Sequence, residues 1–124
     1  MEQEMLNTDT LNLETLNQET LNQEALNSAL LILVVSPKLE EVIVDLLLEQ
    51  PALSGFTSSH VSAHGTTNSK LSLKEQVTGR QQKVQFMVYG DFTALQNLIN
   101  TLKTTFANSG LRTILLSAIA SEVI

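Results

Sequence analysis

The sequence predicts an α+β fold in which a four-stranded antiparallel sheet carries two helices on one face. Apolar or alternating runs typical of strands occur four times between residues 29 and 119. Amphipathic runs typical of helices separate the first strand from the second and the third from the fourth. A long polar segment joins the second strand to the third. This β-α-β-β-α-β order is that of a ferredoxin-like split βαβ unit, which predicts an architecture and not an activity.

The first strand and the first helix follow directly from the pattern. Residues 30–35 are apolar at every position, as in a central strand covered on both faces. Ser36 and Pro37 predict a helix start, with a hydroxyl N-cap followed by proline in the first turn. Pro51 and Gly55 are expected to close this element. The apolar face of the helix comprises Leu39, Val42, Ile43, Leu46 and Leu47.

Alternation predicts the next two strands, over residues 57–64 and 84–88. Asp91 is the predicted N-cap of the second helix, residues 108–110 end it, and residues 111–119 form the last strand. We expect Phe92 in the core together with the apolar face of the second helix, which comprises Leu95, Leu98, Ile99, Leu102 and Phe106.

Composition and charge exclude several function classes. Residues 1–25 carry six of the 13 acidic residues and none of the seven Lys and Arg, so the remainder is neutral overall. A neutral domain with few aromatic residues lacks the basic, stacking surface that nucleic acids require. The longest apolar run, residues 29–35, is far shorter than the ~20 residues of a membrane span. Without cysteine and without a basic leader, the chain is expected in the cytoplasm.

Residues 1–28 are predicted to lie outside the domain, which spans residues 29–124. Residues 5–29 repeat a five-residue pattern that holds Leu-Asn in place. A five-residue step turns each Leu by about 140° around a helix and puts successive Leu residues on opposite faces of a strand. Because neither element gains a buried side, we interpret the repeat as a low-complexity acidic extension, disordered or partly helical, and not as a pentapeptide-repeat β-helix.

Segment 65–82 is long for a loop within a compact domain, which favours a functional role. The runs LSGFTSSHVSAHG at 53–65 and LSLKEQVTGR at 71–80 resemble a small uncharacterised bacterial family of PII-like proteins. The resemblance covers residues 29–122, and its most specific parts are residues 54–56, 64–65 and 75–80. Members of this family are typically encoded beside heavy-metal efflux pumps of the resistance-nodulation-division type.

The resemblance implies a homotrimer that is related in fold to the nitrogen regulatory protein PII and to CutA-like proteins. Segment 65–82 corresponds in place to the partner-binding T-loop of PII, so the implied role is regulation by protein contact. The expected partner is a protein of a heavy-metal efflux system. The candidate ligand- or partner-binding residues are Gly65, Glu75, Gln76, Gly79 and Arg80 in the segment and Lys83 next to it.

The basic residues of this segment suit an anion or an acidic patch on a partner protein. For Lys70 and Lys74, charges solvated by water are the favoured interpretation, whereas for Arg80 the two interpretations stay open. The PII proteins bind ATP with a glycine-rich loop before the fourth strand and with basic residues beyond it. Here only residues 108–110 precede Leu111 and nothing basic follows Arg112, so no ATP site of that type is expected.

His60 and His64 are the two histidines, and both are candidate ligands of a divalent transition metal. On a strand they share a face but stand about 13 Å apart, too far for one metal ion to bind both. A metal site would therefore need one histidine from each of three chains. The favoured alternative is a polar residue at a subunit interface or at the base of the loop.

Enzyme motifs are absent, since the chain has no Cys, no G-x-S-x-G and no H-E-x-x-H. A small acylphosphatase-like enzyme is the third hypothesis, but Val35-Ser36-Pro37-Lys38 offers no phosphate-cradling glycines. The first hypothesis is a non-enzymatic PII-like regulator, and the second is a CutA-like metal-binding protein. No cofactor is required by the first.

Apolar residues remain for the sheet face away from the helices. Met87 and Tyr89 alternate with Phe86 and Val88, so they are expected on that face beside alternate residues of the first strand. An exposed apolar layer of this size usually marks an interface. Oligomerisation therefore follows from the pattern as well as from the resemblance.

Overall fold

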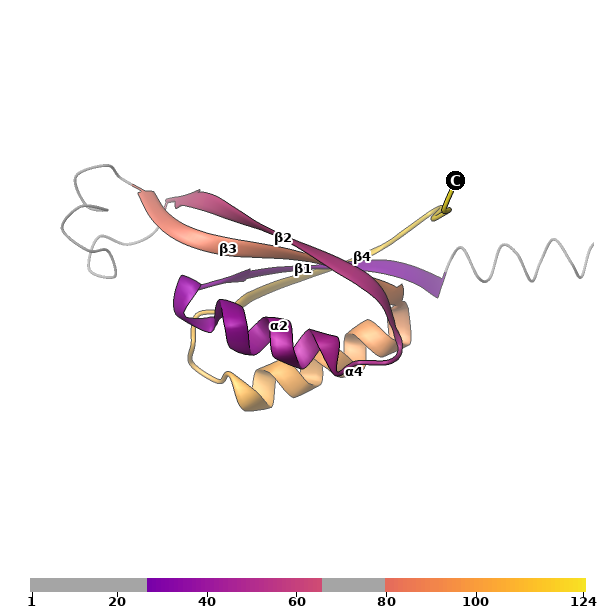
Figure 1. The fold of residues 1–124 in the computed structure, drawn as a ribbon, viewed down its shortest axis with the longest axis horizontal. Coiled ribbons are helices and arrows are strands. Elements are labelled where there is room, and N and C mark those ends of the chain that lie inside the picture. The colour runs from indigo at the N-terminus through magenta and orange to yellow at the C-terminus, as the bar shows by residue number, and fades with distance from the viewer. Residues whose placement is uncertain (1–26, 66–79) are drawn as a thin grey trace, which may run out of the picture.

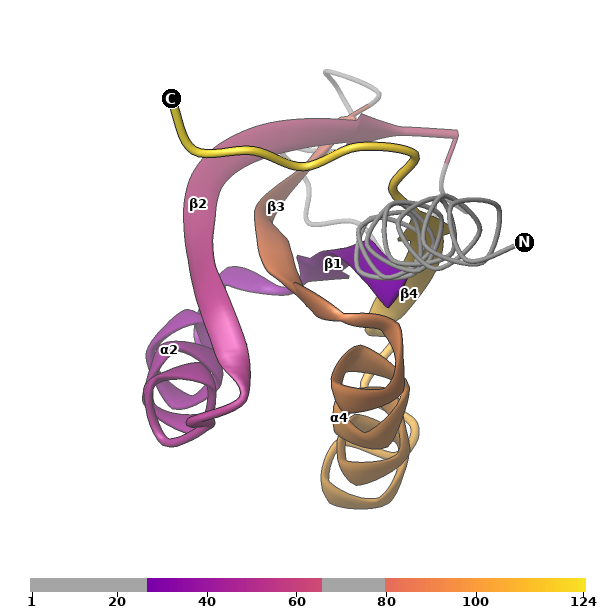
Figure 2. The same cartoon turned by 90° about the vertical axis from the view of Figure 1, so that its right-hand side faces the viewer.

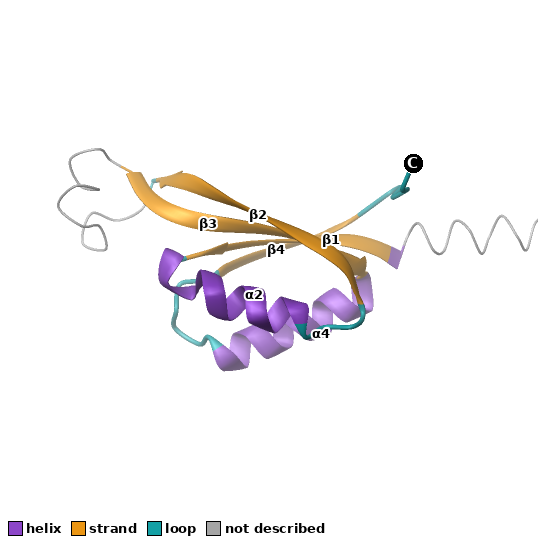
Figure 3. Ribbon diagram, viewed as in Figure 1, coloured by secondary structure: helices purple, strands orange, loops and turns teal. Residues whose placement is uncertain are grey.

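The computed structural model describes residues 27–65 and 80–124. In this part of the chain the four strands form one antiparallel sheet in the order β2-β3-β1-β4, and both helices cover the same face of it (Figures 1 and 3). The predicted ferredoxin-like fold class is confirmed. The elements are β1 (Ser28–Val35), the 3₁₀ turn η1 (Pro37–Leu39), α2 (Glu40–Leu48), β2 (Leu53–His64), β3 (Arg80–Asp91), α4 (Phe92–Thr105) and β4 (Arg112–Ser117).

The core lies between the sheet and the helices. Side chains of β1 alternate, so that Leu31 and Leu33 are fully buried against the helices while Ile32 on the other face is only half-buried. The expectation that β1 is covered on both faces is therefore not met within one chain. The other buried apolar side chains are Ala29, Val35, Ile43, Leu47, Val84, Phe86, Val88, Leu95, Leu98 and Leu102.

The two helices begin differently. The backbone of Ser36 is extended, but its side chain makes no capping hydrogen bond, and Pro37 starts a 3₁₀ turn before α2. The predicted N-cap at Asp91 is confirmed, because its carboxylate Oδ2 accepts a hydrogen bond from the backbone N–H of Thr93 at 3.2 Å. A side-chain acceptor at this position satisfies one of the N–H groups that the helix leaves unpaired.

Several predicted boundaries and burials are wrong. The first helix ends at Leu48, and Gly55, which was expected to close it, lies within β2. There the φ of 150° at Gly55 accommodates a register irregularity between Leu53 and Gly55. The side chain of Val42 is 46% exposed and that of Phe92 is 36% exposed, so neither belongs to the core. Phe92 is the first residue of α4, ahead of the turn that packs on the sheet.

The predicted loop at 65–82 also extends too far. Residues 80–82 belong to β3, where Arg80 is paired with His64 and Gln82 with Ser62. Their polar side chains give no apolar alternation, but their backbones continue the ladder with β2. The connection between the paired strands is therefore segment 65–79.

Of the helices in the described ranges, none is long and apolar enough to cross a membrane.

The difference between the two helix starts can be measured. Replacing Asp91 with Ala removes a capping acceptor, so the free energy of unfolding should fall by about 1 kcal/mol. Ser36→Ala is the matched control, because Ser36 makes no capping bond and its replacement should cost clearly less. Urea unfolding followed by circular dichroism measures both. Equal losses in the two variants would show that the Asp91 bond contributes nothing to stability.

Candidate functional site

The long pair of strands β2 and β3 continues past the end of the central strand. β1 pairs with β3 as far as Val35 and Val84, whereas β2 and β3 remain paired through four more positions, up to His64 and Arg80. Figure 1 shows these strand ends reaching past the first turn of α2. We call residues 61–64 and 80–83 the ribbon. A two-stranded ribbon without a third strand is only marginally stable by itself, which suits a surface that contacts another molecule.

The ribbon places its predicted site residues on two faces. His64 lies opposite Arg80, and both are exposed on one face of the ribbon. Lys83 lies opposite Val61 on the other face and is half-buried. Because successive side chains of a strand alternate, Arg80 and Lys83 do not form one basic patch. They present positive charge on opposite faces of the same ribbon.

Gly65 follows β2 directly and has a φ of 80°, a left-handed conformation that glycine adopts without strain. This conformation turns the chain away from the ladder at the end of β2. The other predicted residues of the segment, Glu75, Gln76 and Gly79, lie outside the described residues, as do Lys70 and Lys74. One face of the ribbon therefore brings together Arg80, His64 and the base of the segment at Gly65.

His60 lies on the same side of β2 as His64 but contacts a helix. Its Nε2 lies 3.3 Å from Oε1 of Glu40, the first residue of α2. The side chain of His60 is 71% exposed and that of Glu40 is 31% exposed. When the imidazole is protonated this contact is an ion pair, and because it is exposed to water its net contribution is small. Sequence reasoning missed Glu40, which becomes a neighbour only when α2 packs over β2.

His60 and Glu40 supply two groups of the kind that bind transition metals. Within residues 27–65 and 80–124, no cluster of three or more His, Asp or Glu side chains is placed to hold a metal ion. His64 is four residues along the strand, about 13 Å away. A complete metal site at either histidine therefore requires ligands beyond these described residues.

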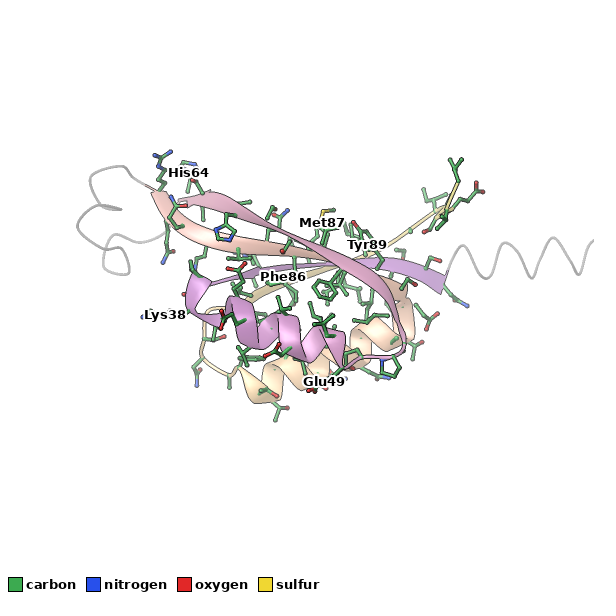
Figure 4. The ribbon with its side chains drawn as sticks, in the orientation of Figure 1. Lys38, Glu49, His64, Phe86, Met87 and Tyr89 are labelled. Atoms are coloured by element: carbon green, nitrogen blue, oxygen red, sulfur yellow. The ribbon has the colours of Figure 1, made fainter. Side chains whose placement is uncertain are left out.

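The sheet face away from the helices is a second candidate surface, which we call the open face. Figure 4 shows Met87 and Tyr89 on this side and Phe86 on the other. The Tyr89 hydroxyl lies 3.5 Å from Oγ1 of Thr57, across the β2–β3 pair. The apolar side chains of β1, β3 and β4 that share this face by register are Leu30, Ile32, Val34, Met87, Tyr89, Ile114 and Leu116.

Register settles which residues of β1 join this layer. Ile32 lies between Met87 and Ile114, and Leu30 lies between Tyr89 and Leu116. Tyr89, Ile114 and Leu116 are 39%, 44% and 47% exposed. The open face thus presents a contiguous apolar strip across three strands, which is the feature that marks interfaces.

Comparison with solved structures places the fold. A DUF3240 family protein from Shewanella baltica OS155 matches with a TM-score of 0.64 at 17% identity, over 79% of this chain and 97% of that one. CutA from Synechococcus elongatus PCC7942, complexed with Bis-Tris, has a TM-score of 0.60 at 16% identity, over 77% and 84% of the two chains. CPII from Thiomonas intermedia K12 has a TM-score of 0.59 at 13% identity, over 78% and 96%.

CPII is a nitrogen regulatory PII-like protein bound to ADP, AMP and bicarbonate. At these identities the likeness shows a shared fold and not a shared ligand. No curated protein matches the chain in sequence. The model of the family described as "protein of unknown function (DUF3240)" matches residues 25–121. The chain therefore belongs to the DUF3240 family, and its fold is that of the CutA and PII-like proteins.

Proposed function

We propose that this chain is a PII-like regulatory protein that acts by contact with a partner protein through segment 65–79 and the ribbon that carries it. It works as a cytoplasmic homotrimer, and the partner belongs to a heavy-metal efflux system. The observation that carries the proposal is the ribbon, in which β2 and β3 continue beyond β1 and hold the two ends of the segment away from the core. A binding segment raised on paired strands reaches a partner without disturbing the packed layer.

The charges of the ribbon indicate what kind of surface it contacts. Arg80 and Lys83 are its formally charged residues, and among residues 61–64 and 80–83 none is acidic. An acidic surface on the partner would therefore be attracted to both faces of the ribbon. The link to heavy-metal efflux rests on the resemblance carried by residues 53–65 and 71–80. The fold shared with CPII, a nitrogen regulatory PII-like protein, supports regulation rather than catalysis.

The open face supports assembly of several copies. Figure 3 shows both helices on one side of the sheet, and the register places the apolar strip on the other side. Removing such a surface from water stabilises an interface by about 25 cal/mol for each Å² of apolar area buried. A second copy presents the same strip, so packing between copies covers several faces at once.

Reversing the charge of the ribbon should abolish partner binding. We expect the double variant Arg80→Glu/Lys83→Glu to bind the partner at least about tenfold more weakly, equivalent to about 1.4 kcal/mol, because attraction becomes repulsion. Affinity-tagged protein is recovered from metal-stressed cells, and the co-purified protein is identified by mass spectrometry and titrated against purified wild type and variant.

Lys103→Glu is the control for this experiment, since Lys103 lies in the last turn of α4, away from the ribbon. It changes the net charge in the same direction and should keep the partner. Recovery of the wild-type trimer with nothing attached would contradict the regulatory proposal. Equal binding by the ribbon variant and the control would contradict the role of the ribbon.

Assembly is tested on the open face. Placing a charge in the strip with Ile114→Lys should convert the oligomer to a folded monomer, because Ile114 is 44% exposed and does not belong to the core. Leu48→Lys is the matched control, since Leu48 is 70% exposed on the helical layer and its replacement should leave the mass unchanged. Light scattering on a sizing column gives the masses. A monomeric wild type would refute the assembly.

The contact between His60 and Glu40 favours a second candidate function, binding of a divalent metal in the manner proposed for CutA-like proteins. In a trimer, histidines from three chains would supply the missing ligands. If the chain has this function, a calorimetric titration with Cu(II), Zn(II) or Ni(II) should show binding to the wild type that is lost in His60→Ala or His64→Ala. The regulatory proposal expects wild type and both variants to bind equally weakly, so the titration separates the two.

A further inference from the structure

The two faces of the ribbon differ in exposure and in chemistry. The face that is fully exposed carries Ser62, His64, Arg80 and Gln82. The face that is half-buried carries Val61, Ala63, Gln81 and Lys83. Each side chain of the exposed face can donate a hydrogen bond, from a hydroxyl, an imidazole, a guanidinium or an amide group. We therefore call this face the donor face.

The donor face has no acidic side chain to accept those hydrogen bonds. Among residues 27–65 and 80–124, the acidic residues lie on α2 and at its C-cap, at the far end of β3, or beyond β4. They are Glu40, Glu41, Asp45, Glu49, Asp91 and Glu122. Within these ranges Arg80 forms no ion pair. Residues 66–79 hold two lysines and one glutamate, so by sequence they add positive charge to the tip of the hairpin.

His60 shows what the donor face lacks. Figure 2 shows α2 alongside β2, and there Oε1 of Glu40 lies 3.3 Å from Nε2 of His60. His64 lies on the same side of β2 four residues further on, beyond the first turn of α2. Within the described ranges it has no carboxylate beside it. The fold thus supplies a carboxylate to the first histidine, whereas the second lies beside Arg80 with no acid at hand.

The spacing of the donors indicates the shape of a ligand. His64 is paired with Arg80, and Ser62 is paired with Gln82. Paired side chains of neighbouring strands have Cβ atoms about 5 Å apart. The two pairs lie about 7 Å apart along the ribbon, because two residues of a strand span that length. Alternate side chains of any extended peptide have the same separation, so such a peptide can present one acceptor to each pair.

We propose that the donor face binds two carboxylates at alternate positions of an extended acidic segment of the partner protein. One carboxylate accepts hydrogen bonds from Arg80 and His64, and the other accepts them from Ser62 and Gln82. A guanidinium suits the first because its planar fork matches the two oxygens of a carboxylate. This inference rests on the acidic partner of the proposed function. It adds the face that makes the contact and the chemical groups that are bound, while Lys83 attracts the segment from the other face.

Two labelled peptides of equal composition and charge test the spacing. In Thr-Glu-Thr-Glu-Thr the two carboxylates lie on one side of an extended chain, whereas in Thr-Thr-Glu-Glu-Thr they lie on opposite sides. Each peptide is titrated with the full chain at low salt, and binding is followed by fluorescence anisotropy. The alternating peptide should bind several-fold more tightly. Equal affinities for the two peptides, or no binding of either, would overturn the proposal.

Substitutions at exposed positions identify the face. Arg80→Lys keeps the positive charge but loses the planar fork, so the affinity for the alternating peptide should fall several-fold. His64→Phe removes the imidazole donor and should weaken binding in the same way. Lys83→Gln is the control, because it removes a charge from the other face, and it should keep the preference for the alternating peptide. Wild-type affinity in Arg80→Lys, or loss of that preference in Lys83→Gln, would count against the donor face.

The outcomes also separate this inference from the proposed function. Suppose that a partner is recovered and is lost from Arg80→Glu/Lys83→Glu, but the two peptides bind equally. The ribbon then contacts its partner by charge alone, and the inference fails while the proposed function stands. If the alternating peptide is preferred but no partner is recovered, the regulatory proposal fails and the donor face remains a carboxylate-binding surface.

Discussion

The structure depends on one constraint, which is that two helices cover only one face of a four-stranded sheet. Among residues 27–65 and 80–124, all twelve buried apolar residues lie on the helical side of the sheet or in the helices themselves. On β1, the buried Leu31 and Leu33 alternate with the half-buried Ile32, although all three are equally apolar. A strand that is apolar on both faces is stable in water only when both faces are covered. The single chain satisfies half of this requirement, and the proposed assembly satisfies the rest.

Unequal strand lengths create the second surface. β2 and β3 have 12 residues each, whereas β1 has eight and β4 has six. Beyond the end of β1, β2 and β3 pair only with each other. The apolar alternation of Val84, Phe86 and Val88 ends there, and residues 80–83 of β3 are polar. The ribbon is thus the part of the sheet that the core no longer reaches. At its base Val84 is fully buried in the core, whereas beyond Val84 the ribbon is held by the single ladder between β2 and β3.

The sequence patterns predicted the order of elements, the face of α4 and the cap at Asp91, because these depend on local spacing. Residues 80–82 pair through their backbones and show no apolar alternation, so the pattern predicts Arg80 in the loop and not in β3. The pattern also predicts a stop at Gly55, because glycine is typical both of helix ends and of strand irregularities. The contact of His60 with Glu40 had no sequence signal, because it arises only when α2 packs over β2. Arg80 and Lys83 lie on opposite faces because side chains alternate along a strand. This can be predicted only when β3 is known to begin at Arg80.

Lys83 belongs to both proposed surfaces, and this joins them. It is a residue of the ribbon, yet its register with Val61 places it on the same face as Met87 and Tyr89, through which copies are proposed to assemble. A partner bound at the ribbon and a second copy packed on the open face therefore lie beside the same ammonium group. By linkage, any effect of one contact on the affinity of the other is reciprocal, so contact at the ribbon and assembly of copies are coupled through Lys83.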